Sequence, residues 1–322
     1  MQQEIKQPLI VIAGPTAVGK TELSLLLARR IGGEIISADS MQVYRHMDIG
    51  TAKLEAEKRR EIAHHLIDIL EPEEEFNVVL FQKLARQAVK EIAGRGHIPV
   101  VAGGTGFYIQ ALLYDIDFTE TKENPALRER LARMAREQGP QALHDRLREV
   151  DPQAAEEIHA HNVKRVIRAL EFFSQTGKKI SDHNRAERGR PSSYRFFYYV
   201  LNTDRAALYE RIDRRVDAMM EAGLLEEVRA LRARGLTRDM VSMQGLGYKE
   251  MLSYLDGERS LEEAVSVLKR DTRHFAKRQL TWFKRERDVR FLNLPDYGSD
   301  PQRLLGVILQ DLAAARIREA GV

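Results

Sequence analysis

The sequence predicts an α/β fold in which a parallel sheet carries an all-helical insertion, and three observations lead to this prediction. Short apolar runs alternate with helical patterns over the first third of the 322 residues. These apolar runs stop between about 119 and 190, where only helical patterns occur. An apolar run rich in aromatic residues then follows at 194–201. Strands that alternate with helices favour a parallel sheet, and the interruption favours an insertion.

Strands are predicted at the short apolar runs, and helices where apolar residues recur every three or four positions. The predicted strands are 8–13, 34–39, 65–70, 98–102, 194–201 and 289–294. The predicted helices are 22–30, 77–93, a helix through Tyr108, Leu112 and Leu113, four insertion helices at 125–139, 140–150, 152–160 and 163–176, most of 203–287, and a terminal helix. The core therefore comprises 1–118 and 191–322, with a basic helical C-terminal region, and the insertion comprises 119–190.

One glycine-rich loop joins the first predicted strand to the first predicted helix. Its residues are Gly14, Pro15, Thr16, Ala17, Val18, Gly19, Lys20 and Thr21, which fit the pattern G-x-x-x-x-G-K-[ST]. In such a loop the backbone N–H groups and the helix N-terminus attract an anion, and Lys20 adds a full positive charge. The Thr21 hydroxyl is then placed to bind a Mg²⁺ shared with the phosphates. The sequence therefore predicts a P-loop NTPase-like core that binds a diphosphate or a triphosphate.

Further polar residues follow the second and fourth predicted strands, at the edge where open parallel sheets bind ligands. Asp39 and Ser40 follow the second strand, and Gly103-Gly104-Thr105 follows the fourth. Asp39 fits two interpretations, a base that faces a substrate beside the phosphates and a turn or helix cap. The fourth strand lacks the terminal aspartate that usually holds Mg²⁺ in ATP-hydrolysing P-loop proteins. This weakens a motor or GTPase interpretation, although small P-loop kinases also manage without that residue.

Composition narrows the classes of protein further. The chain has no cysteine, which excludes disulfides, thiolate nucleophiles and cysteine-bound zinc and fits a cytoplasmic location. We find neither an apolar run of about 18 residues nor a signal-peptide pattern, so we expect no membrane span and no membrane partner. A net charge of +3 is mildly basic, so the distribution of the basic residues matters more than their sum.

Basic residues gather in three places. Arg211 and Arg215 lie on one face of a predicted helix, where either can neutralise a leaving group, unless they belong to a solvated face with acidic partners. Near the C-terminus one helical stripe carries Arg270, Arg273, Lys277 and Lys284. The insertion adds a group that begins with Lys164, Arg165 and Arg168. Two such regions favour a long folded polyanion over a mononucleotide, with a merely soluble surface as the alternative.

Several strings occur in the order found in one known family. They are the P-loop, Ile36-Ser37-Ala38-Asp39-Ser40, Met47-Asp48-Ile49-Gly50-Thr51-Ala52-Lys53, Gly103-Gly104-Thr105, Gly245-Leu246-Gly247-Tyr248 and Lys277-Arg278-Gln279-Leu280-Thr281-Trp282. On these residues the chain resembles the bacterial tRNA dimethylallyltransferases, also called tRNA isopentenyltransferases. Leu54 stands where many members have proline, and Phe107 stands where leucine is common. We expect neither departure to touch the chemistry.

The resemblance implies transfer of a dimethylallyl group from dimethylallyl diphosphate to the exocyclic N6 of an adenine in tRNA. That adenine is 3′-adjacent to the anticodon in tRNAs that read codons beginning with U. Asp39 would be the general base. Lys20 and Thr21 would contact the diphosphate and Mg²⁺, and Arg211 would meet the leaving group.

The resemblance also implies contacts with the anticodon stem-loop of tRNA. The implied residues are Asp39, Ser40, Met41, Gln42, Thr105, Arg128, Lys164, Arg165, Val166, Ile167, Arg168, Gln244, Gly245, Gly247, Tyr248, Lys249, Lys277, Arg278, Gln279, Trp282 and Lys284. We expect the protein to act as a monomer.

Three other functions fit parts of the sequence. A small-metabolite P-loop kinase that uses ATP would share the loop and the arginine-rich helix. A prenyltransferase acting on free adenine nucleotides would share the chemistry, but it needs neither a large insertion nor a basic C-terminal region. An RNA-binding module with a structural P-loop would bind tRNA and transfer nothing.

Overall fold

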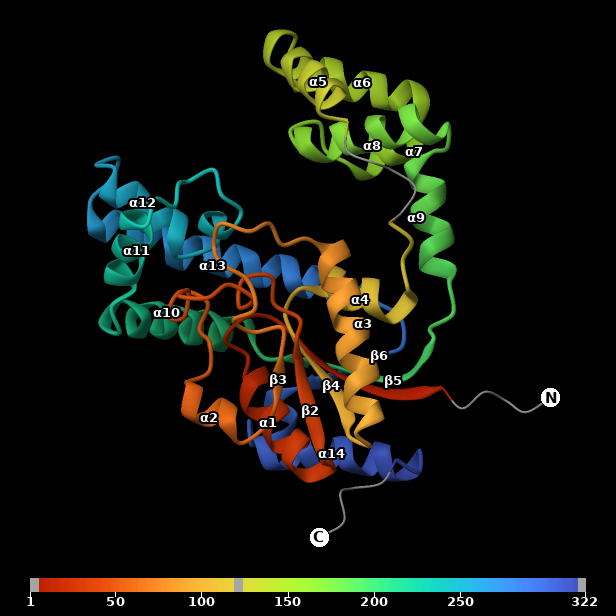
Figure 1. Ribbon diagram of the computed structural model, residues 1–322, viewed down its shortest axis with the longest axis vertical. Coiled ribbons are helices and arrows are strands. Elements are labelled where there is room, and N and C mark those ends of the chain that lie inside the picture. Colours follow the sequence, from red (N-terminus) through yellow and green to blue (C-terminus); the bar gives the residue numbers. More distant parts are fainter. Residues whose placement is uncertain (1–5, 119–123, 318–322) are drawn as a thin grey trace, which may run out of the picture. The chain divides into compact units, whose positions relative to one another are not determined.

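The computed structural model describes residues 6–118 and 124–317, which fold into two compact units. The first unit comprises Met1–Leu113 and Ser193–Val322, and the second comprises Tyr114–Ser192. The predicted insertion, 119–190, falls within the second unit, and its first residues, 119–123, lie outside the described residues. Figure 1 shows a sheet with surrounding helices in the first unit and a group of helices in the second.

The first unit is built on a sheet in which every paired strand runs parallel to its neighbour. Its strands are β1 (Gln7–Ala13), β2 (Gly33–Ser37), β3 (His64–His65), β4 (Ile98–Gly103), β5 (Tyr194–Asn202) and β6 (Val289–Asn293), in the order β3-β2-β4-β1-β5-β6. Ile10 of β1 lies opposite Val100 of β4 on one side and Phe197 of β5 on the other. The predicted parallel α/β fold is confirmed.

Helices and short 3₁₀ turns connect these strands and extend the first unit toward the C-terminus (Figure 1). They are α1 (Lys20–Ile31), α2 (Ala56–Arg60), α3 (Val78–Gly94), α4 (Gly106–Tyr114), α10 (Arg205–Glu221), α11 (Leu224–Ala233), η1 (Ser242–Gln244), α12 (Tyr248–Leu255), α13 (Leu261–Phe283), η2 (Leu294–Tyr297) and α14 (Pro301–Ala314). Most of 203–287 is thus helical, as predicted.

Both faces of the central strand are buried. Ile10 and Ile12 of β1 pack in one apolar cluster with Leu27 of α1 and with residues of α14. Leu9 and Val11 are also fully buried, and they lie on the other face because successive strand residues point to opposite sides. A strand covered on both faces reads as a continuous apolar run, which is why its position was predictable.

The third predicted strand is too long: β3 covers only His64–His65, because the chain turns immediately afterwards. Leu66 has a φ of 63° and Asp68 a φ of 54°, values that end an extended strand. The Asp68 carboxylate is held by Lys53 and Arg59, each at 2.5 Å. These ion pairs anchor the segment against the loop that follows β2.

The second unit consists of five helices among its described residues. They are α5 (Pro125–Glu137), α6 (Pro140–Val150), α7 (Pro152–Glu157), α8 (Val163–Thr176) and α9 (Ile180–Gly189). Leu131, Leu143, Leu147 and Val166 pack in their shared core. Of these helices, α9 was not predicted, since its sequence is mostly polar. None of the helices in the described ranges is long and apolar enough to span a membrane.

Candidate active site

The P-loop joins β1 to α1 with the backbone shape that an anion cradle needs. Gly14 has a φ of +142°, and a Cβ there would lie 2.6 Å from the Leu201 carbonyl oxygen. Gly19, immediately before α1, has a φ of +106°. Both positions therefore require glycine. The loop turns tightly and presents the N-terminus of α1, with its unpaired N–H groups, to the carboxyl edge of the sheet.

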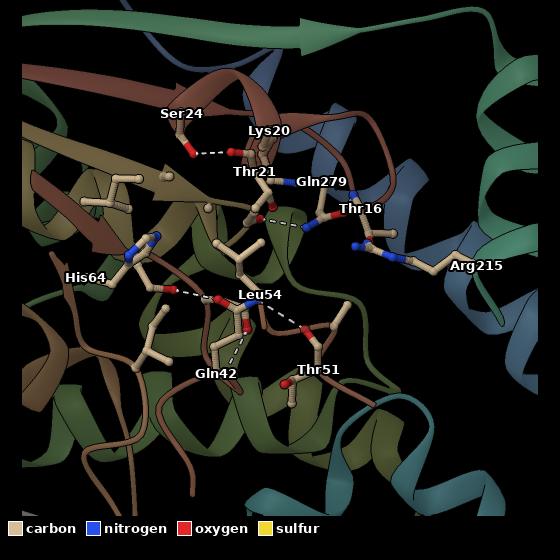
Figure 2. A pocket seen from close by; sticks show the side chains of 18 of the residues that line it. Thr16, Lys20, Thr21, Ser24, Gln42, Thr51, Leu54, His64, Arg215 and Gln279 are labelled. Atoms are coloured by element: carbon tan, nitrogen blue, oxygen red, sulfur yellow. Dashed lines mark hydrogen bonds between the residues drawn. The ribbon is translucent and has the colours of Figure 1, made fainter. Parts of the chain in front are cut away.

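A cavity of about 110 Å³ lies at this edge. Three kinds of side chain line it: cations and hydroxyls from the P-loop and α10, a carboxylate with neighbouring polar groups after β2, and apolar residues. The lining residues are Thr16, Lys20, Thr21, Ser24, Ile35, Ser37, Asp39, Gln42, Thr51, Ala52, Leu54, His64, Ile67, Ala102, Gly103, Gly104, Arg215, Phe275 and Gln279. Figure 2 shows Lys20, Thr21 and Thr16 across the cavity from Gln42 and Thr51.

Leu54 lines this cavity, which corrects the expectation that its departure from proline lies away from the chemistry. The exposed Phe107 is placed elsewhere, with its ring 5.9 Å from that of Trp282. The sequence analysis assigned no role to the cavity residues Thr51, His64 and Ile67. Thr51 belongs to the family string from Met47 to Lys53, whereas no motif included His64 or Ile67.

The Lys20 ammonium is buried beside the Arg215 guanidinium. Its Nζ donates to the Pro15 carbonyl oxygen at 2.7 Å. Burial, together with repulsion from the Arg215 guanidinium, lowers the pKa of Lys20 to about 7, although Asp39 acts in the opposite direction. An anion in the cavity would favour the charged form of this lysine.

Arg215, rather than Arg211, reaches the P-loop. The Arg215 Nη1 donates to the Thr16 Oγ1 at 3.0 Å, and its side chain lines the cavity. Arg211 is not among the cavity residues. The two arginines share one helix face, but the four-residue spacing separates them by about 6 Å along the axis. The structure therefore favours Arg215 over Arg211 as the residue that meets the leaving group, and this contact stays a prediction.

Gln279 of α13 connects the P-loop to the loop after β4. Its Oε1 accepts a hydrogen bond from the Thr16 backbone N–H at 2.9 Å, and its Nε2 donates to the Gly104 carbonyl oxygen at 2.9 Å. A Cβ on Gly104 would lie 2.2 Å from that Nε2, so the close approach requires glycine. Because Gln279 is buried by these contacts, its side chain is not available to tRNA in this conformation.

Asp39 forms the turn that one of its two interpretations predicted, and its role as a base stays a prediction. Its Oδ1 accepts hydrogen bonds from the backbone N–H groups of Met41 at 2.8 Å and Gln42 at 3.3 Å, which closes a turn. No residue in the described ranges donates a hydrogen bond to its Oδ2. The turn thus fixes one carboxylate oxygen and leaves the other for a ligand in the cavity.

The residues expected to contact tRNA fall into two groups in the first unit. Gly245, Gly247, Tyr248 and Gln279 are buried. The remaining positions are exposed or half-buried: Asp39, Ser40, Met41, Gln42, Thr105, Gln244, Lys249, Lys277, Arg278, Trp282 and Lys284. Buried side chains cannot bind RNA without leaving the core. Only the exposed and half-buried residues therefore remain candidates for contact with tRNA.

The second unit shows the same division. Lys164 and Arg165 are exposed at the start of α8, whereas Val166 and Ile167 are buried. Arg128 and Arg168 both bind the fully buried Glu171, at 2.8 and 3.3 Å. Although burial opposes it, the hydrogen bond from Arg128 helps to lower the pKa of Glu171, which stays charged. These two arginines therefore stabilise the second unit by pairing with Glu171.

The donors in the cavity fit a Mg²⁺ that is bound together with phosphates. No group of three or more histidine, cysteine or acidic residues among the described residues could hold a metal by itself. Thr21 offers an exposed hydroxyl at the start of α1, beside the P-loop. Mg²⁺ commonly keeps several waters and binds through few protein ligands plus substrate phosphates, so this donor set is compatible with it.

Comparison with known proteins gives a consistent result. The profile of the family described as IPP transferase matches residues 42–286. The chain is 58% identical to a tRNA dimethylallyltransferase of Lachnoclostridium phytofermentans, over 94% of this chain and 96% of that one. It is similar to the crystal structure of a tRNA isopentenylpyrophosphate transferase from Bacillus halodurans, with a TM-score of 0.71, 44% identity and coverage of 96% and 98%.

A second structural relative is a eukaryotic dimethylallyltransferase acting on tRNA. Its TM-score is 0.81 and its identity 31%, with coverage of 96% of this chain and 80% of that chain.

We expect the affinity for inorganic diphosphate to fall as the pH rises above the Lys20 pKa of about 7. Lys20 must be protonated to attract the anion, so above that pH binding includes the uptake of a proton. In a Lys20→Arg variant the side chain stays protonated at every pH tested. Dividing the wild-type affinity by the affinity of this variant cancels the effect of the diphosphate's own titration. Measured by calorimetry, this quotient should fall by up to about tenfold per pH unit above the Lys20 pKa. A quotient independent of pH would contradict the prediction.

We expect Arg215→Ala to weaken diphosphate binding by roughly 10- to 100-fold, the value of a charge-assisted hydrogen bond. Arg211→Ala removes the same charge one turn away and serves as the matched control, with an expected change below about threefold. Equilibrium binding at constant salt measures both. Equal losses in the two variants would show that overall charge, rather than the contact at Thr16, attracts the ligand.

Proposed function

The chain belongs to the IPP transferase family, and we propose that it is an enzyme that transfers a dimethylallyl group from dimethylallyl diphosphate to tRNA. One observation carries this proposal: Lys20 of the P-loop, Arg215 of α10 and the Asp39 carboxylate line a single cavity. The acceptor that we propose is the exocyclic N6 of the adenine 3′-adjacent to the anticodon, in tRNAs that read codons beginning with U. We also propose that the protein acts as a monomer.

The P-loop side of the cavity stabilises the leaving group. During transfer the bond between C1 of the dimethylallyl unit and the diphosphate oxygen breaks, and its electron pair stays with the diphosphate. Backbone N–H groups at the start of α1, the Lys20 ammonium and the Arg215 guanidinium are positioned to stabilise that charge. Mg²⁺ bound at Thr21 would supply further neutralisation of the diphosphate oxygens.

Asp39 supplies the base on the other side of the reaction. The N6 nitrogen forms its new bond to C1, and its proton passes to the carboxylate. An adenine amine is a weak nucleophile, so removal of this proton lowers the barrier. The turn through Met41 and Gln42 holds the carboxylate, and its free Oδ2 is the oxygen that we assign to the proton.

Exposed cations in both units are the proposed contacts to the tRNA backbone. Lys277 is exposed on α13, Lys284 is exposed directly after its end, and Lys164 and Arg165 are exposed on α8. Arg273, in contrast, binds Asp213 at 2.6 Å, so the predicted basic stripe on α13 is shorter than the sequence suggested. The target adenine has to leave its stack to reach the cavity, at a cost of about a few kcal/mol.

Labelled dimethylallyl diphosphate tests the proposed function directly. The protein, Mg²⁺ and unmodified tRNA should yield label in one adenosine of the anticodon loop. Phosphoryl transfer from ATP to a small metabolite without RNA would support a kinase instead. Label in free AMP or ATP but not in tRNA would support a prenyltransferase of nucleotides, and tRNA binding without transfer would support an RNA-binding module.

We expect Asp39→Asn to reduce the rate of transfer by about 10²- to 10⁴-fold, the usual contribution of a general base. Asparagine retains an oxygen for the turn, so the affinity for tRNA should stay within about threefold. Glu22→Gln is the matched control because it removes an exposed carboxylate from the first turn of α1. Single-turnover rates and filter binding measure the two effects. A near-normal rate in Asp39→Asn would remove this residue from the mechanism.

We expect the double change Lys277→Gln and Lys284→Gln to weaken tRNA binding mainly at low salt. Each lost phosphate contact should reduce the slope of log affinity against log salt by about 0.7 to 0.9. The control is the double change Lys269→Gln and Arg270→Gln, since these residues of α13 already bind Asp217 and Asp271. The prediction fails when both double variants show the wild-type slope.

A further inference from the structure

One carboxylate from the C-terminal helices holds the loop that follows Asp39. Glu227 lies in α11, and its Oε2 accepts hydrogen bonds from the backbone N–H groups of Asp48 at 2.8 Å and Ile49 at 2.7 Å. Its Oε1 accepts a third from the Gly50 N–H at 3.1 Å. Successive backbone N–H groups that converge in this way form a concave anion-binding turn. Here the anion is a side chain of the same protein.

The segment Gly245 to Tyr248 packs around the same turn. Tyr248 is fully buried, and its hydroxyl donates to the Glu227 Oε1 at 2.7 Å. A Cβ on Gly50 would lie 2.6 Å from the Tyr248 ring, and one on Gly245 would lie 2.6 Å from the Met41 Cε. The missing side chains therefore let α12 approach the loop closely.

Hydrogen bonds continue from this turn to the base. The residue after Gly50 is Thr51, whose carbonyl oxygen accepts a hydrogen bond from the Gln42 Nε2 at 3.2 Å. The backbone N–H of Gln42 in turn donates to the Asp39 Oδ1 at 3.3 Å. Thr51, Gln42 and Asp39 all line the cavity. The orientation of the Asp39 carboxylate thus depends on where the turn at Gly50 lies.

The Glu227 carboxylate interacts with this turn and with Tyr248. Within residues 6–118 and 124–317 its hydrogen bonds come from three backbone N–H groups and one hydroxyl, and no cation pairs with it. A glutamine would place an NH₂ group against N–H donors and lose part of this set. The loop has a second anchor, because the buried Lys53 binds the Tyr44 carbonyl oxygen and the Asp48 and Asp68 carboxylates. Loss of the Glu227 contacts should therefore shift the turn without unfolding the loop.

We propose that Glu227, assisted by Tyr248, is a positioning residue that sets the orientation of Asp39 through the turn at Asp48 to Gly50. This inference rests on the proposed function, in which Asp39 receives the proton from the attacking amine. Glu227 touches neither substrate, and it acts through the backbone of the loop. The reaction is sensitive to such placement, since a displacement of about 1 Å can cost about 100-fold in rate.

The test compares Glu227→Gln with Glu226→Gln. Glu226 is the adjacent residue of α11, is exposed and binds Arg229, so its change removes the same charge without touching the loop. For Glu227→Gln we expect kcat to fall by roughly 10- to 100-fold, while KM for dimethylallyl diphosphate and the affinity for tRNA stay within about threefold. Tyr248→Phe, which removes one of the four hydrogen bonds, should lower kcat by a smaller factor.

Amide hydrogen exchange provides a readout that is independent of catalysis. The amides of Asp48, Ile49 and Gly50 should exchange at least about tenfold faster in Glu227→Gln than in Glu226→Gln, since each loses its acceptor. Faster exchange at these amides together with a selective fall in kcat would establish the positioning role.

Two results would overturn the inference. One is a kcat for Glu227→Gln equal to that of Glu226→Gln. The other is a parallel loss of kcat, both substrate affinities and thermal stability, which would indicate a structural role only. Failure of the proposed function can be distinguished from these two results. In that case the unchanged protein itself would transfer no label from dimethylallyl diphosphate to tRNA.

Discussion

The chemistry of this protein depends on one electrostatic constraint, because two cations and a carboxylate share a small cavity at the carboxyl edge of the sheet. Burial and the neighbouring Arg215 together lower the pKa of Lys20 to about 7, so the free site is unfavourable for its own charges. Asp39 offsets only part of that cost. In the proposed reaction, a diphosphate would relieve the repulsion by interacting with both cations, and its departure from the prenyl carbon would increase the negative charge that they meet. Such an arrangement would favour the state in which negative charge develops on the leaving group, which is the condition for catalysis.

A second constraint is steric and explains why the C-terminal helices belong to the site. Helix α13 lies against the loop after β4 and the start of α4 because Gly104 and Gly106 have no side chain there. A Cβ on Gly104 would meet Gln279 at 2.2 Å, and one on Gly106 would meet the Trp282 ring at 2.2 Å. This approach lets Gln279, 263 positions after Thr16 in the chain, hold the P-loop backbone directly. The shape of the anion cradle is thus set partly by residues that no local sequence pattern connects to it.

The sequence predicted features that depend on local patterns and failed where tertiary contacts decide. The buried strands and the P-loop follow from apolar runs and glycine spacing, and Asp39 follows from its place after β2. The end of β3 could not be predicted in this way, because the turn at Asp68 is held by ion pairs with Lys53 and Arg59. Nor could spacing choose between Arg211 and Arg215, because both share one helix face and only packing shows which turn reaches Thr16. The placement of tRNA-contacting residues remains a prediction, although burial removes several of them from it.

The strings that mark the family combine two physical roles that the sequence alone does not separate. In α13, Gln279 is buried and contacts the P-loop, whereas Lys277 is exposed. Residues two positions apart on a helix point about 200° apart, so one short string serves both an interior contact and a surface. The same logic applies to the segment that ends at Tyr248, whose buried ring packs against the turn that supports Asp39. Helices α12 and α13 also contact each other. A contact between RNA and Lys277, as we propose it, would therefore act on the same packed helices that hold the P-loop through Gln279 and the turn at Gly50 through Tyr248.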